Sequence, residues 1–308
     1  MAVINTGSFS KALWPGVNAW YGKAYDEYPV EWTNIYDQFT SRKAFEEDVG
    51  ISSFGLAQVK PEGQGISYDN EQQGYISRYT HVNYGLGFIV TREAFDDDQY
   101  DVVAERRAKG LAFSMRQTKE TVGANVLNRA FTSTYTGGDG VMLCTNAANG
   151  GGHPNVAGGV QYNRLTTAAN LSEAALEQAV IDISRYTNDR GLKIAVQPKS
   201  IIIPPELSFE AERILKSQYR VGTPNNDISA LVSMGKFPGG VHVNHYLTLS
   251  TAWFVKTNVQ DGLKYFERKG DTFTEDNDFD TENAKFKATG RYSFGWTDWR
   301  GVHASEGV

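Results

Sequence analysis

The alternation of apolar and polar positions is most regular between residues 74 and 91. Residues from Ile76 to Val90 in steps of two share one face of an extended chain, and only the later half of that face is apolar. We therefore predict a long β-hairpin with arms near residues 51–60 and 75–90 and a turn-rich tip. The second arm would be about 50 Å long at ~3.3 Å per residue. Its polar outer half then needs support, either from the body of its own domain or from another subunit.

The next segment, residues 92–131, has the pattern of one long helix. Three acidic residues, Asp96 to Asp98, stand at its start, where the helix dipole favours negative charge. Apolar residues recur in steps of three, four or their sums and form a narrow stripe: Val103, Leu111, Met115, Val122 and Val126. About thirty residues correspond to roughly 45 Å of helix, which is long for a globular domain. Gly110 and Gly123 are expected to weaken the helix slightly.

The first 48 residues are rich in aromatic side chains set among Gly, Pro and Asn, with weak periodicity. A free flexible tail would be poor in aromatic residues. Two interpretations therefore stay open from the pattern alone. The segment is either a subdomain packed on its own chain or an arm that finds its apolar partner on a neighbouring subunit.

From Asn170 onward the pattern changes to mixed helices and strands. Asn170 with Glu173 resembles a capping box, and the helix that follows is expected to end at Gly191. Its apolar side is Leu176, Ala179, Val180 and Ile183. A buried strand at 200–203 is closed by two prolines, and Pro205 opens a second helix. Further strands are predicted at 241–247, 252–257, 262–268 and 284–296. Without regular βαβ alternation, the fold class is α+β.

Composition narrows the class of protein. The chain has 308 residues, 40% of them hydrophobic and 21% charged, which is typical of a folded protein with a real core. The net charge is −6 and no basic run is longer than Arg106-Arg107, so no surface that tracks phosphates is expected. A single Cys144 excludes an internal disulfide. No signal peptide and no membrane-spanning apolar run are visible, so we expect a soluble intracellular protein with no membrane partner.

Candidate chemistry is sparse. His242 and His245 would lie on opposite faces of a strand, so one metal ion could not bind both. The acidic segment at 271–282 departs from the EF-hand template at Thr281 and Lys287, and we interpret it as a solvated loop. The glycine-rich segment at 136–159 lacks a phosphate-binding motif, and no nucleophile motif occurs. We therefore predict no catalytic, cofactor or metal site, and a protein that is not an enzyme.

Four segments taken together carry a family resemblance. They are GFIVTREAFDDDQYD (87–101), DGVMLCTNAANGGGHPNVAGGVQYNRLTTAANLSEAALEQAVIDI (139–183), DRGLKIAVQPKSIIIPPELSFEAERILKS (189–217) and the region from DGLKYFERKG to the C-terminal strands (261–303). In this order they resemble the major capsid protein of tailed bacteriophages, of the Mu-like major head subunit type. The resemblance runs from about residue 50 to the end of the chain.

The resemblance implies a tailed-phage major capsid fold with four parts. These are an N-terminal arm at 1–48, an extended β-hairpin loop at 49–92, a peripheral domain with a long spine helix at 93–164 plus 258–290, and an axial domain at 165–257 plus 291–308. The extended loop would lie across a neighbouring subunit, with intersubunit contacts from Lys60, Glu62, Tyr68, Tyr75, Arg78 and Tyr79. The loop near the capsomer axis would present Arg220, Asn225, Asn226 and Asp227.

The implied function is self-assembly as pentamers and hexamers into an icosahedral head that encloses double-stranded DNA without reading its sequence. The implied partners are copies of the chain, a scaffolding protein, a portal and a decoration protein. The protein would belong to the virion and assemble in the cytoplasm of the host bacterium. The mildly acidic charge agrees with a wall that does not grip the packaged polyanion.

Two alternatives come from other classes. A cellular nanocompartment shell of the same fold would enclose a protein cargo in small uniform particles and no DNA. An enzyme that uses the dispersed carboxylates would need an acid/base pair in a cleft, and would turn over substrate as a monomer that does not assemble.

Overall fold

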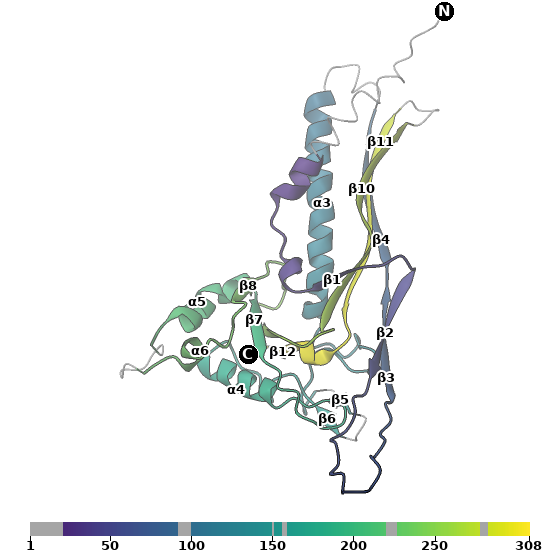
Figure 1. The fold of residues 1–308 in the computed structure, drawn as a ribbon. Coiled ribbons are helices and arrows are strands. Elements are labelled where there is room, and N and C mark those ends of the chain that lie inside the picture. Colours follow the sequence, from purple (N-terminus) through teal and green to yellow (C-terminus); the bar gives the residue numbers. More distant parts are fainter. Residues whose placement is uncertain (1–20, 92–99, 150, 156–158, 220–226, 278–282) are drawn as a thin grey trace, which may run out of the picture.

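The computed structural model describes residues 21–91, 100–149, 151–155, 159–219, 227–277 and 283–308. Figure 1 shows an elongated molecule in which helix α3 and a long sheet stand side by side. A smaller unit with helices α4, α5 and α6 lies at one end, next to a two-stranded ribbon. Asp96, Asp97 and Asp98 lie outside the described residues.

The long helix is confirmed as α3, Tyr100–Asn128. It packs on a four-stranded sheet with the order β1 (Asp37–Thr40), β10 (Leu263–Asn277), β11 (Ala284–Trp296) and β4 (Val82–Val90). Strand β1 is parallel to β10, and the other pairs are antiparallel. Leu111 and Met115 of the predicted stripe are buried in one cluster with Tyr21 and Ala288, and Val122 and Val126 are partly buried against a second cluster around Trp32 and Leu127. Small residues widen the stripe, because Ala108, Ala112 and Ala124 are also buried.

Gly123 has a packing role that the sequence pattern did not predict. A Cβ atom at this position would come within 3.3 Å of the Phe294 ring and 3.4 Å of the Trp32 Cβ. The helix backbone therefore approaches β11 and the N-terminal segment more closely than a side chain would allow. The cost of a helical glycine is offset by this packing.

The described part of the N-terminal segment packs on its own chain. A helical turn spans 21–27, a 3-10 helix η2 follows at Trp32–Asn34, and β1 joins the long sheet. Trp32, Ile35 and Tyr36 are buried in one core with Leu127 of α3 and Tyr265 of β10. For residues 21–40 the own-chain interpretation is therefore right, and residues 1–20 lie outside the described part.

The predicted hairpin is wrong in its pairing. Its first arm is β2, Phe45–Ile51, and residues 52–72 contain no strand. Its second arm is two strands that separate at His81: β3 (Gln73–Thr80) pairs with β2, and β4 pairs with β11. The physical reason is the change of polarity along the segment. In the apolar half, Tyr84, Phe88 and Val90 pack on the core. The polar half pairs with the acidic strand β2, where Arg78 lies over the Phe45 ring at 3.8 Å.

The smaller unit is built on a second four-stranded sheet. Its order is β12 (Val302–Ser305), β9 (Trp253–Thr257), β7 (Pro198–Ile203) and β8 (Val241–Val243). Helix α4 (Glu173–Ser184), the 3-10 helix η3 (Pro205–Leu207), α5 (Ser208–Lys216) and α6 (Ala230–Ser233) accompany it. The short strands β5 (His153–Pro154) and β6 (Val160–Gln161) and the 3-10 helix η4 (Trp299–Gly301) complete the elements.

The apolar side of α4 is confirmed, but its two ends are not where the sequence predicted. Leu176, Ala179, Val180 and Ile183 are buried in one cluster with β7 and β9. The N-cap is Ser172, whose Oγ accepts a hydrogen bond from the Ala175 N–H at 3.2 Å, and not Asn170. The helix ends at Ser184, because the chain then forms a tight turn around Gly191 instead of continuing the helix.

Two strand predictions need correction. Strand β8 stops at Val243, four residues before the predicted end. Strand β10 is longer than predicted and reaches Asn277, so residues 271–277 of the acidic segment are sheet rather than loop. Strand β11 also runs across the predicted domain boundary at residues 290/291 and ends at Trp296. The division into domains otherwise stays a prediction.

Candidate assembly surfaces

The base of the β2–β3 ribbon is anchored on its own chain. The Tyr75 hydroxyl donates to the Thr297 carbonyl at 3.1 Å, and the Tyr79 hydroxyl lies 2.6 Å from the Thr297 Oγ1. Thr297 Oγ1 donates to Asp48 Oδ2 at 2.8 Å, so Tyr79 is the donor in its own bond. Lys264 Nζ also contacts Asp48, at 2.6 Å. The ribbon therefore leaves the body of the subunit from a fixed base.

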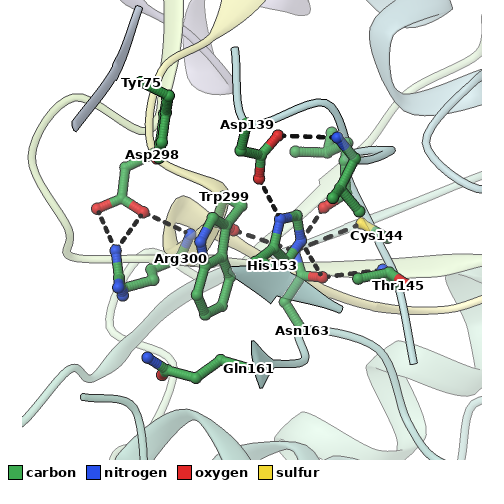
Figure 2. Close-up of polar contacts among 12 residues, drawn as sticks. Tyr75, Asp139, Cys144, Thr145, His153, Gln161, Asn163, Asp298, Trp299 and Arg300 are labelled. Atoms are coloured by element: carbon green, nitrogen blue, oxygen red, sulfur yellow. Dashed lines mark hydrogen bonds and ion pairs between the residues drawn. The ribbon is translucent and has the colours of Figure 1, made fainter. Parts of the chain in front are cut away.

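A buried polar junction lies behind this base, and Figure 2 shows it with Asn163 at its centre. The Asn163 side chain is fully buried, and its Nδ2 faces the carbonyl oxygens of Leu143 (2.7 Å), Trp299 (3.1 Å) and Val302 (3.0 Å). Its Oδ1 accepts from the Thr145 N–H at 3.0 Å. One amide thus joins the segment after α3 to η4 and β12.

His153 completes the junction. Its Nδ1 lies 2.5 Å from Asp139 Oδ2 and its Nε2 lies 3.3 Å from Asn163 Oδ1, while the Trp299 ring stacks on it at 4.4 Å and 3°. The three carbonyls around the Asn163 Nδ2 fix its Oδ1 as an acceptor. Both imidazole nitrogens of His153 therefore face acceptor oxygens, those of Asp139 and Asn163.

Arg300 links the junction to a turn at residues 187–193. Its Nη2 donates to Asp189 Oδ1 at 2.8 Å and its Nε donates to the Thr187 carbonyl at 2.9 Å. Its Nη1 lies 3.2 Å from Asp298 Oδ1, and burial raises the pKa of Asp298 above its ordinary value. The post-α3 segment, the end of β11 and the turn after α4 are thus held together as one unit.

The junction lacks the features of an active site. Burial raises the pKa of the Cys144 thiol well above its ordinary range, so this thiol is not a nucleophile. Among the described residues, no group of three His, Cys, Asp or Glu side chains is placed to hold a metal ion. His245 instead pairs with Glu31, at 2.6 Å from its Nδ1. Across the part of the chain described by the structure, no helix has both the length and the apolar character needed to span a bilayer.

The extended loop at residues 52–72 forms a large exposed surface. Its large apolar side chains face solvent, with exposed fractions of 54% for Phe54, 80% for Leu56, 92% for Val59, 59% for Ile66 and 88% for Tyr68. Such a concentration of exposed apolar side chains is typical of an interaction surface. The loop is closed at its base, where the Gln72 N–H donates to Ser52 Oγ at 2.8 Å.

The six contact residues predicted on the loop fall into two groups. Lys60, Glu62 and Tyr68 are exposed in the loop, and the Arg78 side chain on β3 is 55% exposed. Tyr75 and Tyr79 are directed to their own chain, and Tyr79 is only 4% exposed. The sequence left open whether this strand is supported by its own domain or by another subunit. At these two tyrosines the support comes from the same chain, because their hydroxyls bond to Thr297.

A second exposed apolar surface lies at the end of the smaller unit. Phe209 on α5 is 78% exposed, Ile228 70% and Met234 65%. Tyr219 forms an antiparallel bridge with Ile228. Asp227, one of the predicted axis residues, is exposed beside this bridge. Arg220, Asn225 and Asn226 lie outside the described residues, so their role stays a prediction.

The junction residues were not predicted from the sequence. His153 was expected only to bond with nearby backbone, and Asn163 and Arg300 had no assigned role. The one signal available was the presence of polar residues among small and apolar neighbours in residues 139–165. Two partners of Asn163, Trp299 and Val302, are more than 130 positions away, and Arg300 binds Thr187 and Asp189 more than 110 positions away. No periodic pattern indicates such contacts.

Comparisons with known proteins agree with this architecture. A family model described as phage capsid protein matches residues 75–305. No curated protein gives a significant match. The Mu-like subtype stays a prediction.

Three solved structures share the fold. The mature capsid of bacteriophage PhiM1 is 12% identical, with a TM-score of 0.57 and coverage of 90% of this chain and 87% of that one. The virus-like particle from Pyrococcus furiosus is 11% identical, with a TM-score of 0.52 and coverage of 93% and 96%. Mycobacterium phage Adephagia is 10% identical, with a TM-score of 0.52 and coverage of 90% of both chains. At these identities the likeness shows the fold. Because the family model spans most of the chain, this protein belongs to the phage capsid protein family, as a structural shell subunit rather than an enzyme.

Proposed function

We propose that copies of this subunit join as pentamers and hexamers and close into the icosahedral head of a tailed phage around double-stranded DNA. The observation that carries the proposal is the exposed apolar surface of the extended loop, which extends from a base fixed on Thr297. A neighbouring subunit is the partner that would cover it. Rings of such head-to-tail contacts close into capsomers.

The energetics favour many weak contacts. Burying a large apolar side chain contributes roughly 1.5–3 kcal/mol, and the lost freedom of the docked subunit cancels part of that gain. Each loop would therefore add only a few kcal/mol. A shell with one such contact per subunit closes cooperatively and can still correct a misplaced subunit.

The remaining partners follow from the same role. The net charge of −6 and the scattered basic residues support a wall that encloses DNA without gripping it. A scaffolding protein, a portal and a decoration protein would complete the particle, with assembly in the bacterial cytoplasm. The loop that holds Arg220, Asn225, Asn226 and Asp227 would lie near the capsomer axis.

The test removes the apolar surface and keeps the loop length. The triple variant Leu56→Ser, Val59→Ser and Tyr68→Ser should fold with the circular dichroism and melting curve of the wild type, because these side chains are exposed. Negative-stain microscopy and sedimentation should then show free subunits or small rings and no shells. The matched control Ile181→Ser removes a 46% exposed apolar side chain from α4 and should leave shells intact. Shells at wild-type yield from the triple variant would contradict the role of the loop.

The content of wild-type particles separates phage head from nanocompartment. Particles recovered during phage production should protect double-stranded DNA from nuclease. A uniform protein cargo with no protected DNA would favour the nanocompartment.

A further inference from the structure

The extended loop is held on the smaller unit by one side chain, Arg190. Its Nη1 lies 2.6 Å from Asp69 Oδ2, and its Nη2 donates to the Asn70 carbonyl. Within the described part of the chain, every hydrogen bond or ion pair from residues 53–71 to residues outside the loop goes to Arg190. The orientation of the loop relative to the body therefore depends on this residue.

Asp69 connects both sides of the loop to Arg190. Its Oδ2 also accepts from the Gly55 N–H at 2.8 Å, and its Oδ1 accepts from the Asn70 N–H at 2.9 Å. These backbone donors, together with Arg190, lower the pKa of Asp69 to about 2, so the carboxylate is charged in any assembly buffer. A Cβ at Gly55 would lie 3.3 Å from Asp69 Oδ2, and the missing side chain leaves room for this close approach. Asp69 thus joins the outgoing side to the returning side, and Arg190 binds the returning side at Asp69 and Asn70.

The turn that carries Arg190 is well ordered by its own bonds. Asn188 Oδ1 accepts from the N–H of Arg190 (3.0 Å) and of Leu192 (2.8 Å), and the Asn188 N–H donates to the Leu192 carbonyl at 2.7 Å. Gly191 has a φ of +80°, which favours glycine. The adjacent Asp189 binds Arg300 of the buried junction. The position of the loop is thereby linked to the core of the subunit.

We propose that Arg190 is a positioning residue for shell assembly, which sets the angle of the extended loop before subunits meet. The inference rests on the proposed function, because it assumes that the loop docks on a neighbour. A loop that is already oriented loses less conformational freedom on docking. A fixed angle also limits the curvature that neighbouring subunits can adopt. The Arg190 side chain is 22% exposed and the Asp69 side chain 43%, so the contact is moderate in strength and can adjust while the shell closes.

The test compares four variants of the full chain. Arg190→Gln and Asp69→Asn remove the ion pair, and Arg190→Lys keeps the charge. Lys193→Gln removes a positive charge from the same turn, and among the described residues Lys193 forms no hydrogen bond or ion pair with the loop. Hydrogen exchange of residues 53–71 is measured on unassembled subunits. Light scattering and electron microscopy then give the assembly rate and the distribution of shell diameters.

For Arg190→Gln we expect exchange in the loop to rise by up to about fivefold, most clearly at the Gly55 and Asn70 N–H groups that are bonded to Asp69. Assembly should slow and shell diameters should broaden. Asp69→Asn should give the same effects, Arg190→Lys should recover part of both, and Lys193→Gln should match the wild type. Unchanged exchange, or faster exchange with an unchanged assembly rate and diameter, would overturn the proposal. If the wild type itself forms no shells, the proposed function fails, and the exchange data still show whether Arg190 holds the loop.

Discussion

Asn163 provides the sharpest test of the buried junction. Its amide is fully buried and its five polar neighbours come from three separate segments of the chain. Asn163→Ala removes all of these bonds at once. Asn163→Asp keeps the size of the side chain but turns the atom that faces three carbonyl oxygens from a donor into an acceptor.

The expected magnitude follows from the groups left without a partner. The Thr145 N–H and the His153 Nε2 lose the acceptor at 3.0 and 3.3 Å, and each such buried donor costs about 1–3 kcal/mol. The three carbonyls keep a second lone pair, so each adds less. We expect Asn163→Ala to lower the free energy of unfolding by about 3–5 kcal/mol, a large part of the 5–15 kcal/mol that is typical of a folded protein. Asn163→Asp should lower the free energy of unfolding by at least as much at neutral pH.

Urea unfolding of unassembled subunits, followed by tryptophan fluorescence, measures this loss. With a slope of about 3 kcal/mol/M, a loss of 4 kcal/mol would move the midpoint by roughly 1.3 M. Asn83→Ala on the exposed edge strand β4 is the control and should change stability by less than ~0.5 kcal/mol. A loss below ~1 kcal/mol for Asn163→Ala, or an Asp variant as stable as the wild type, would refute the argument that this amide holds the junction.

Two further predictions concern buried ionisable groups. Lys119 lies 3.5 Å from Glu267, 3.8 Å from Asp271 and above three aromatic rings. Lys119→Met should therefore lower the free energy of unfolding, measured in urea, by about 3–5 kcal/mol. An equal loss for the exposed Lys109→Met would contradict this. Burial lowers the pKa of His303 from 6.5 to about 3, so the folded ring stays neutral while the unfolded chain gains a proton below about pH 6.5. The stability linked to this ring is complete above pH 6.5 and falls as the pH drops towards 3, by a few kcal/mol at pH 4.5. His303→Gln should remove most of that loss between pH 7 and pH 4.5, and the same loss in the variant would rule His303 out as its source.

The elements that the sequence predicted well are those fixed by local patterns. The apolar stripe between residues 103 and 126 predicted α3, and the apolar side at 176–183 predicted how α4 packs on the sheet. The apolar run before the double proline predicted the buried strand β7. Strand pairing was beyond such reasoning. Residues 82–90 and 73–80 have one continuous alternation, yet the first stretch pairs with residues 284–292 and the second with 45–51. Which strand residues 82–90 pair with depends on a partner about 200 positions away and on the burial of His81.

The candidate surfaces were predicted only in part, for a similar reason. A polar strand face indicates solvent or a partner, and it does not say which. Lys60, Glu62 and Tyr68 are exposed, and their contacts with a neighbouring subunit stay a prediction. The hydroxyls of Tyr75 and Tyr79 bond to Thr297 of the same chain. The sequence did not indicate a role for Arg190, because the role of one arginine in a turn depends on its partners, here Asp69 and Asn70, which are about 120 positions away.

The parallel pairing of β1 with β10 has a consequence for synthesis of the protein. Asp37 lies opposite Lys264, and the sheet between α3 and the solvent also needs β11, which ends at Trp296. At about 5–20 residues per second, the ribosome needs roughly 10–45 s to reach β10 after it has made β1. The central layer of the molecule therefore forms only when translation is nearly finished. A chain cut short before residue 284 lacks β11, which joins β10 to β4, so we expect truncated products to fail to complete the sheet and to stay out of any particle.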